Sequence, residues 1–452
     1  MKKLSFLVCG KLGSLCSSHR SRITHSDGCT NADHDQVDRI SKLPASVRAH
    51  ILSFLPIKDA VKAMQLRCFG SLWASIDNLD LNLCLSHDCR IVVARDSDDF
   101  KFIDFVHQVL LLHQKSDIYR LHLSLRGLLH VVQLSYAIPS DPCPHSQELL
   151  KRETDLADMC IHFAMRKEVK ILDLDFVAAC QEDWLKHWTF LHKGMYKVSD
   201  CLFSCDSLQQ LSLVYCRVVA PAGQICMKCL QTLYLRHVYL DDSTVENLIS
   251  GCPLLENLSL IRCYGFQKLN FASPNLKYVN VFRHTSSGLE ISGPHIKVLH
   301  MRSCLFRDFK LDNYSSALDV TLGLCSAPLV DAKSYEKYPG LRMMLEQCKY
   351  AQALTIEARI LEVSEDMGDN MITPEVREGE NGGSFKFVLN HLRIVRFHWW
   401  EMDFELFQLV RFVLMAARNL EKIVISPTPN FIYKIILLSL PRASPRAVML
   451  FT

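Results

Sequence analysis

Residues 208–213, 230–235 and 255–260 read LQQLSL, LQTLYL and LENLSL, which are three copies of one six-residue phrase. In each copy an apolar residue is followed by two variable residues, an apolar residue, one variable residue and an apolar residue. Residues 276–281 (LKYVNV) and 296–301 (IKVLHM) repeat the phrase, and the five copies start 20 to 25 residues apart. So regular a distance predicts a chain built from stacked units of one kind.

Each copy ends in alternating apolar and variable residues, which is the pattern of a strand that buries one face. Such a strand, returning about every 20 to 29 residues, is typical of leucine-rich repeats, whose strands stack into a curved sheet. Five copies at nearly constant spacing make a set of unrelated buried strands the weaker interpretation. Weaker copies of the phrase are Ile118-Leu121-Leu123, Val169-Leu172-Leu174, Ala317-Val320-Leu322, Leu392-Val395-Phe397 and Leu420-Ile423-Ile425.

The variable positions of the phrase predict where a partner binds. Because alternate residues of a strand point to opposite faces, these positions face away from the core and line one continuous concave surface. Tyrosine and arginine are enriched at binding hot spots, although most single surface positions contribute little, so the prediction concerns the group. The residues predicted to bind a protein substrate are Tyr234, Arg236, Asn280, Phe282, His300 and Arg302.

Residues 38–73, DRISKLPASVRAHILSFLPIKDAVKAMQLRCFGSLW, form a second block with a helical pattern. Three short amphipathic helices of this kind bury little surface by themselves, so the block predicts a docking module that needs a partner. Its three apolar stripes are Val47-Ile51-Leu52-Leu55 after Pro44, Ala60-Val61-Met64 after Pro56, and Phe69-Leu72-Trp73-Ile76.

This block resembles the F-box of plant F-box proteins. The resemblance implies that its helices bind a Skp-type adaptor, which bridges to a cullin. Residues 66–70 depart from the family pattern, since LRCFG is one residue shorter and Phe69 replaces the usual tryptophan. The matching motifs are Asp38-Arg39-Ile40-Ser41, Leu43-Pro44, Ile51 through Pro56, Lys58-Asp59-Ala60-Val61 and Leu72-Trp73. The implied adaptor contacts are Leu43, Pro44, Ile51, Leu52, Leu55, Pro56, Leu72 and Trp73.

The C-terminal residues resemble the FBD domain that ends many plant F-box proteins with leucine-rich repeats. The resemblance rests on His391-Leu392, Leu420-Glu421-Lys422 and the closing PRASP of residues 441–445. The predicted fold class is therefore α/β, with a three-helix F-box, an irregular leucine-rich-repeat solenoid and a small α+β C-terminal module. The predicted domains are a disordered leader (1–36), the F-box (37–80), the repeat region (81–358), an acidic flexible loop (359–384) and an FBD-like domain (385–452).

Composition excludes several functional classes. Apolar residues make up 49% of the 452 residues, which supports a large core, and a net charge of +3 predicts no nucleic-acid partner. No segment reaches the length of a membrane span, and the short apolar run of residues 4–8 disfavours a secretory signal. The 19 cysteines lack a regular framework, so we expect reduced thiols in the nucleus and/or cytoplasm.

No catalytic motif, cofactor or metal site is predicted. Cys226 and Cys229 form a Cys-x-x-Cys near Cys201 and Cys205, but a structural zinc site usually needs a second matching pair. A cysteine or metal-dependent hydrolase built on residues 201–229 is the enzymatic alternative.

The resemblance implies a non-catalytic, substrate-recognition subunit of an SCF-type E3 ubiquitin ligase. The F-box would bind the adaptor, and the repeat surface would capture a protein substrate whose identity the sequence does not give. The alternative, motivated by the departure at residues 66–70, is a leucine-rich-repeat scaffold with a degenerate F-box and no ligase role.

Overall fold

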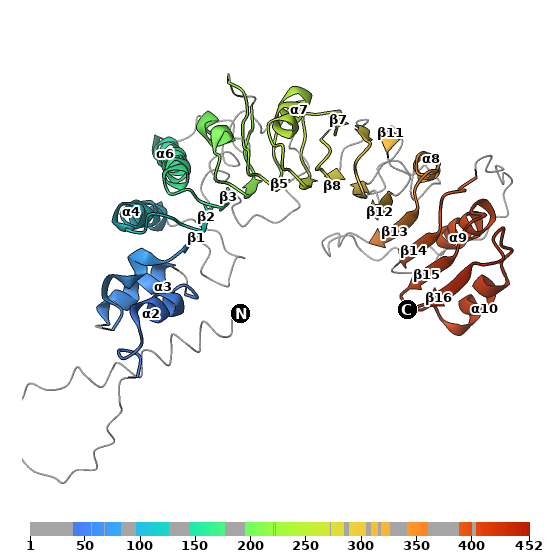
Figure 1. The fold of residues 1–452 in the computed structure, drawn as a ribbon, viewed down its shortest axis with the longest axis horizontal. Helices are drawn as coiled ribbons and strands as arrows, with labels where there is room; N and C mark the ends of the chain where they lie inside the picture. The colour runs from blue at the N-terminus through green and yellow to red at the C-terminus, as the bar shows by residue number, and fades with distance from the viewer. Residues whose placement is uncertain are drawn as a thin grey trace, which may run out of the picture. The chain divides into compact units, whose positions relative to one another are not determined.

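The computed structural model describes residues 39–55, 57–66, 68–82, 96–125, 144–176, 195–219, 221, 223–271, 273–283, 289–303, 309–314, 318–325, 341–359, 388–399 and 404–452. The chain divides into an N-terminal unit, residues 1–179, and a C-terminal unit, residues 180–452. The elements of both are drawn in Figure 1. The predicted leader (1–36) and nearly all of the predicted acidic loop (359–384) lie outside the described residues.

The N-terminal unit begins with a small helical module. It consists of α2 (Ala45–Leu52), α3 (Ile57–Lys62) and two short 3-10 segments, η2 (Ala63–Gln65) and η3 (Gly70–Ser75). Pro44 takes the N-cap position of α2, where its missing N–H costs no helical hydrogen bond. These segments fall within residues 38–76, the stretch of the three apolar stripes.

The buried faces of these helices differ from the predicted stripes. Val47 is 41% exposed although it was expected on the buried face of α2. In α3 the buried residues are Ile57 and Ala60, whereas Val61 is only half-buried. A helical pattern over only six to eight residues predicts a helix but does not determine which side of it is buried. The neighbouring segments decide which side is covered.

Three parallel strands follow the helical module: β1 (Asn78–Asn82), β2 (Arg120–Ser124) and β3 (Ile171–Asp175). Helix α4 (Asp96–Leu112) connects β1 to β2, and helix α6 (Pro144–Arg166) connects β2 to β3. Parallel neighbours need such crossover connections because each new strand must start from the same end of the sheet.

Within its described residues, the C-terminal unit contains ten parallel strands, each paired with the next one named. The five clearest sequence phrases become the first five of them, which confirms the predicted α/β fold with stacked parallel strands. In order these strands are β4 (Gln210–Val214), β5 (Thr232–Arg236), β6 (Asn257–Ile261), β8 (Tyr278–Arg283), β10 (Val298–Ser303), β12 (Asp319–Cys325), β13 (Ala353–Arg359), β14 (Ile394–Trp399), β15 (Lys422–Ser426) and β16 (Val448–Phe451).

The segments that return between these strands cover one face of the sheet, as Figure 1 shows for α7, α8, α9 and the short strands. Where repeats are about 20 residues long, the return segments are three short strands that pair into a second parallel sheet. Longer repeats have room for a helix. The elements are η5 (Asp200–Ser204), α7 (Asp242–Ser250), β7 (Lys268–Asn270), β9 (Leu289–Gly293), β11 (Phe309–Tyr314), α8 (Leu341–Gln347), α9 (Phe404–Ala416) and α10 (Phe431–Ser439).

The core of the C-terminal unit lies between the strands and these return segments. In β5, Leu233 and Leu235 are buried, while Thr232, Tyr234 and Arg236 are half-buried on the other side. The first residue of each of the five clearest phrases, such as Leu230, is also buried. We call the half-exposed side of β4–β16 the open face.

Three of the strands end in the same way. Tyr215, His237 and Arg262 follow β4, β5 and β6 directly, and each has a positive φ of 53 to 57°. Each donates its backbone N–H to the carbonyl of the last or penultimate residue of the next strand in the sheet. His237, for example, donates to Ile261 of β6 at 2.9 Å. This left-handed residue stops the strand and turns the chain toward the return segment.

The predicted FBD-like segment, residues 385–452, supplies the last three strands. β14 pairs with β13, and β15 and β16 follow in the same parallel order. Helices α9 and α10 lie between these strands in the chain. The segment therefore has the predicted mixture of helix and strand, and its strands continue the sheet of the preceding repeats.

Candidate binding surfaces

The helical module holds seven of the eight predicted adaptor contacts within the described residues. Leu52, Leu55 and Trp73 are buried, so they hold the helices together and present no surface to a partner. Pro44 is exposed, and Leu43, Ile51 and Leu72 are half-buried. Pro56 lies outside the described residues.

Two exposed apolar residues were missed by the sequence prediction. Val47 is 41% and Phe54 64% exposed, and the imidazole of His50 lies edge-on to the Phe54 ring at 4.8 Å between centroids. Along α2 and the turn after it, Pro44, Val47, Ile51 and Phe54 are three or four residues apart, which places them on one helical side. We call Leu43, Pro44, Val47, Ile51 and Phe54 the α2 surface.

The segment that departs from the F-box pattern, residues 66–70, belongs to the core of the module. Phe69 is 1% exposed, and its backbone N–H donates to the Leu66 carbonyl at 3.0 Å. Gly70 has a φ of +46°, a conformation that favours glycine. Arg48 donates to the carbonyl of Cys68 and ties the segment to α2. The unusual residues therefore shape the interior of the module.

The module joins the first repeats through backbone hydrogen bonds. The amides of Gln114 and Lys115 donate to the carbonyl of Ala74 in η3, at 3.0 and 3.4 Å. The amides of Tyr119 and Arg120 donate to the carbonyl of Asp77 at 2.9 and 3.2 Å. Only two residues separate η3 from β1, so no linker intervenes between the module and the sheet.

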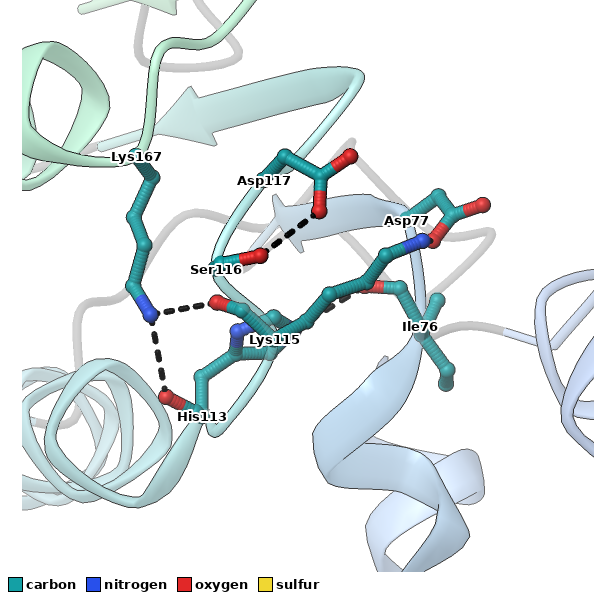
Figure 2. Close-up of polar contacts among 7 residues, drawn as sticks. All are labelled: Ile76, Asp77, His113, Lys115, Ser116, Asp117 and Lys167. Carbon is teal, nitrogen blue, oxygen red and sulfur yellow. Dashed lines mark hydrogen bonds and ion pairs between the residues drawn. The ribbon is translucent and has the colours of Figure 1, made fainter.

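Polar side chains, of which His113 is buried, reinforce this junction (Figure 2). The His113 imidazole is hydrogen-bonded to the Ile76 carbonyl at 2.9 Å, and the Lys167 ammonium donates to the carbonyls of His113 and Lys115. Lys115 also pairs with the Asp77 carboxylate. Burial lowers the pKa of His113, and the nearby Lys167 charge lowers it further. These contacts join the module to β1–β3 within the N-terminal unit.

All six predicted substrate contacts lie on the open face. Strand register places Tyr234, Asn280 and His300 in one row across the sheet, with Ser259 between the first two. A second row contains Arg236, Ile261, Phe282 and Arg302 in the same order. Neighbouring strands of a sheet are about 4.8 Å apart, so each row is a nearly continuous line of side chains.

His300 is anchored to its neighbour. The Tyr278 hydroxyl lies 3.2 Å from His300 Nδ1, and the two rings meet edge to face with centroids 5.1 Å apart. Burial lowers the pKa of His300, and this effect exceeds the opposing influence of Glu357 and Asp319. An imidazole oriented by Tyr278 on the open face suits hydrogen bonding to a partner.

Two ion pairs cross the open face, and sequence reasoning missed three of their four members. Arg302 on β10 reaches Glu357 on β13 at 3.4 Å, and Arg396 on β14 reaches Asp319 on β12 at 3.8 Å. Each pair spans an intervening strand. Gly323 lies beneath the first pair, where a Cβ would approach the Arg302 Cγ to 2.3 Å. The glycine therefore lets the arginine side chain lie flat across the sheet.

The cysteines of residues 201–229 do not gather into a site in the described part of the chain. Cys205 is buried, Cys201 and Cys226 are half-buried, and Cys229 is exposed. Among the described residues, no group of three or more His, Cys, Asp or Glu side chains is placed to hold a metal ion. The described helices include none with the length and hydrophobicity needed to cross a membrane.

Stacked parallel strands with one open face are consistent with a leucine-rich-repeat solenoid. Comparison with known families agrees, because residues 162–320 match the family described as "FBD-associated F-box protein At5g56370, LRR repeats". This matched segment runs from α6 to the start of β12 and contains the five clearest phrases.

The names of similar proteins combine an F-box with leucine-rich repeats, an FBD domain or both. The chain is 25% identical over 301 residues to the F-box/FBD/LRR-repeat protein At1g13780 of Arabidopsis thaliana, covering 64% of this chain and 58% of that protein. It is 25% identical over 336 residues to the putative F-box/LRR-repeat protein At3g18150 of the same plant, covering 73% and 62%. The FBD-associated F-box protein At1g66310, also from this plant, is 26% identical over 310 residues, covering 64% and 58%. The chain thus spans about three fifths of the length of these relatives, and the resemblance to plant F-box proteins with leucine-rich repeats and an FBD domain is confirmed.

Proposed function

We propose that this chain is the substrate-recognition subunit of an SCF-type E3 ubiquitin ligase. The observation that carries the proposal is an exposed apolar α2 surface on a helical module that is joined without a linker to leucine-rich repeats. A Skp-type adaptor that packs on this surface would bridge to a cullin. The role proposed for the chain is non-catalytic.

The rigid junction gives the proposal its mechanism. A ligase receptor accelerates ubiquitin transfer by holding the substrate near the charged conjugating enzyme, and such positioning is effective only if the receptor itself is stiff. The hydrogen bonds at Ala74 and Asp77 fix the α2 surface relative to β1–β3. A flexible linker at this point would spread the substrate over a large volume and weaken the effect.

The open face is the proposed site of substrate capture. Tyr234, Asn280, Phe282 and His300 offer aromatic contact and hydrogen bonds, and Arg236 and Arg302 add positive charge. Such a mixture is typical of the residues that dominate protein interfaces. The substrate is a protein, and the proposed location of the complex is the nucleus and/or cytoplasm.

Complex assembly tests the adaptor half of the proposal. We expect the intact chain to co-purify with a Skp-type adaptor and a cullin, and a Val47→Asp/Phe54→Asp variant to lose both. A buried charge at a docking surface costs several kcal/mol, so the loss should be nearly complete. Leu111→Asp is the matched control, because Leu111 is 80% exposed and belongs to α4, a different helix from the one that carries the α2 surface. Retention of the adaptor by the double variant contradicts the proposed docking surface.

The second candidate function is a leucine-rich-repeat scaffold without a ligase role. The observation that favours it is the altered segment of residues 66–70, whose Phe69 is part of the module core. In this case the folded chain would bind no adaptor, while a Tyr234→Ala/Phe282→Ala variant would still lose a protein that the unaltered chain captures. Adaptor binding therefore separates the two functions, and capture by the open face is common to both.

A further inference from the structure

Three arginines gather around Phe282 on the open face. Strand register places Arg236, Ile261, Phe282 and Arg302 in one row, each on the strand next to that of its neighbour. The third arginine, Arg262, follows β6 directly, and its guanidinium carbon lies 5.2 Å from the centre of the Phe282 ring. This distance is typical of a cation held over an aromatic face. We call these five residues the Phe282 cluster, which combines two apolar side chains with three positive charges.

Negative charge is scarce around this cluster. The strands β4, β5, β6, β8 and β10 contain no Asp or Glu. Among the described strand residues of the open face, the carboxylates are Asp319 on β12 and Glu357 on β13, and each lies within 4 Å of an arginine. Positive side chains therefore outnumber negative ones on this part of the face, so that the Phe282 cluster is complementary to an acidic partner.

The neighbouring row of the open face is polar but carries no fixed charge. It contains the hydroxyl groups of Tyr234 and Ser259, the amide of Asn280 and the imidazole of His300. Each of these residues is half-buried. Such groups donate and accept hydrogen bonds, which suits the peptide groups of a bound chain. The row beside the cluster thus favours a polypeptide as the partner.

The distance between the strands sets the spacing of the partner's residues. From β5 to β10 there are three strand intervals, which amount to about 14 Å at roughly 4.8 Å each. In an extended segment alternate side chains share one side, and residues i and i+4 are about 13–14 Å apart. Residue i+2 then lies over Ile261 and Phe282. The pattern that fits is an acidic residue, an apolar residue two positions later and a second acidic residue two positions after that.

We propose that the Phe282 cluster binds an extended acidic segment of a protein, in which carboxylates flank one apolar residue at two positions to each side. The carboxylates pair with Arg236 and Arg302, and the apolar side chain packs on Phe282 and Ile261. Because Arg302 already faces Glu357 at 3.4 Å, that carboxylate competes with the partner. The inference rests on the proposed function, since it gives the class of substrate for the same open face.

Fluorescence anisotropy of the intact chain with a labelled peptide tests this inference. The probe is a nonapeptide with the central sequence Glu-Ser-Leu-Ser-Glu between short flanks of Gly and Ser. The expected result is saturable binding. Replacement of both glutamates by glutamine, or of the leucine by serine, should weaken it at least about tenfold, because each change removes contacts to the cluster.

Variants of the chain assign the binding to the cluster. Arg236→Ala/Arg302→Ala should weaken binding of the probe at least about tenfold. Lys228→Ala/Arg393→Ala is the matched control, because it removes the same charge from two largely exposed residues that precede β5 and β14. Glu357→Gln should bind the probe more tightly, because it removes the competitor of Arg302. A gain in affinity does not arise from a misfolded variant, so this result is decisive where a loss is not.

The proposal is overturned if the probe does not bind, or if the glutamine peptide or the double arginine variant binds equally well. Weaker or unchanged binding by Glu357→Gln also contradicts it. Co-purification of a Skp-type adaptor with the same protein separates this failure from that of the ligase proposal. Adaptor binding without probe binding refutes only the acidic segment, whereas probe binding without adaptor binding refutes only the ligase role.

Discussion

The helical module before β1 and helix α10 before β16 use similar apolar residues in opposite ways. In the module, Phe69 and Trp73 are buried among neighbouring helices, and the large hydrophobic residues Phe54 and Val47 are exposed. In α10 the exposed apolar residues outnumber the buried one. Composition therefore does not decide burial. The module has α2, α3 and η3 to pack against one another, whereas the described part of the chain provides no further layer over α10.

Two phenylalanines of the module sharpen this contrast. Phe69→Ala removes a fully buried ring and should lower the free energy of unfolding by about 3–5 kcal/mol. Phe54→Ala removes a ring that is 64% exposed and should change it by no more than about 0.5 kcal/mol. Urea unfolding of the two variants measures both values. Equal losses would show that Phe54 is part of the core and would contradict the α2 surface.

Neighbouring residues of α10 allow the same comparison within one helix. Leu437 is fully buried, so Leu437→Ala should cost about 2–5 kcal/mol of unfolding free energy. Ile435→Ala should leave the stability of the monomer within about 0.5 kcal/mol. Urea unfolding of the two variants makes the measurement. A large loss for Ile435→Ala would mean that the outward side of α10 is covered by its own chain.

The N-caps of two helices predict smaller effects with different pH dependence. Asp241 accepts hydrogen bonds from the Thr244 amide and hydroxyl at 2.8 and 2.7 Å, and Asn430 accepts one from the Tyr433 amide at 3.0 Å. Replacement of either by Ala should cost about 1 kcal/mol. Hydrogen bonds from Thr244 and Ser243 lower the pKa of Asp241 below its ordinary 3.8.

The charge of Asp241 therefore adds stability that is fully present above pH 3.8 and declines as the pH falls through its folded-state pKa. Asn430 does not titrate. Thermal unfolding between neutral and acid pH should show a pH-dependent cost for Asp241→Ala and a constant cost for Asn430→Ala. Parallel pH profiles would rule out the proposed stabilisation of the Asp241 carboxylate.

His113 makes the junction of the N-terminal unit sensitive to pH. Its pKa is lowered from 6.5 by burial, so the folded state favours the neutral imidazole. The stability that it contributes is full above pH 6.5 and declines as the pH falls below that value, because the unfolded state gains a proton more readily. His113→Gln should flatten the pH dependence of unfolding near this range. An unchanged slope would assign the pH dependence to other groups.

The loss of the ion pair between Arg302 and Glu357 should have the smallest effect on the unfolding free energy. Arg302 is partly exposed and its partner Glu357 largely shielded, with their nearest charged atoms 3.4 Å apart. Partly exposed pairs contribute about 0–1 kcal/mol, so Glu357→Gln should hardly change the unfolding free energy. The substitution would, however, free the arginine to move, and partner capture should change more than stability does. If the substitution changed stability more than partner capture, the main role of the ion pair would be to stabilise the fold.

The sequence predicts the strands of short repeats well, because their pattern is local. Leu233 and Leu235 are buried as the phrase requires, and all six predicted open-face residues lie on the expected side. Strand β1 was missed although Ile76, Leu79 and Leu81 follow the phrase and are buried. The long α4 connection places the next copy far beyond the usual period, so a search for regular spacing passes over β1.

Other features depend on contacts between distant residues and leave little trace in the sequence. The second sheet of β7, β9 and β11 has strands as short as three residues, too short for a pattern. At β12 the buried residue before the strand is Leu318, one position after the predicted Ala317, which lies outside the described residues. The predicted adaptor contacts Leu52 and Trp73 are apolar and helical, yet only packing reveals that they point inward.

Hydrogen exchange of the intact chain with and without a purified Skp-type adaptor tests the central claim most directly. The account predicts that the adaptor protects amides of α2 and of the turn that carries Phe54, while those of β4–β16 exchange as before. The protected residues would identify the docking surface and leave the open face available for a substrate. Exchange that is unchanged throughout, or protection confined to the repeat strands, would contradict the claim that this chain is a ligase receptor docked through its helical module.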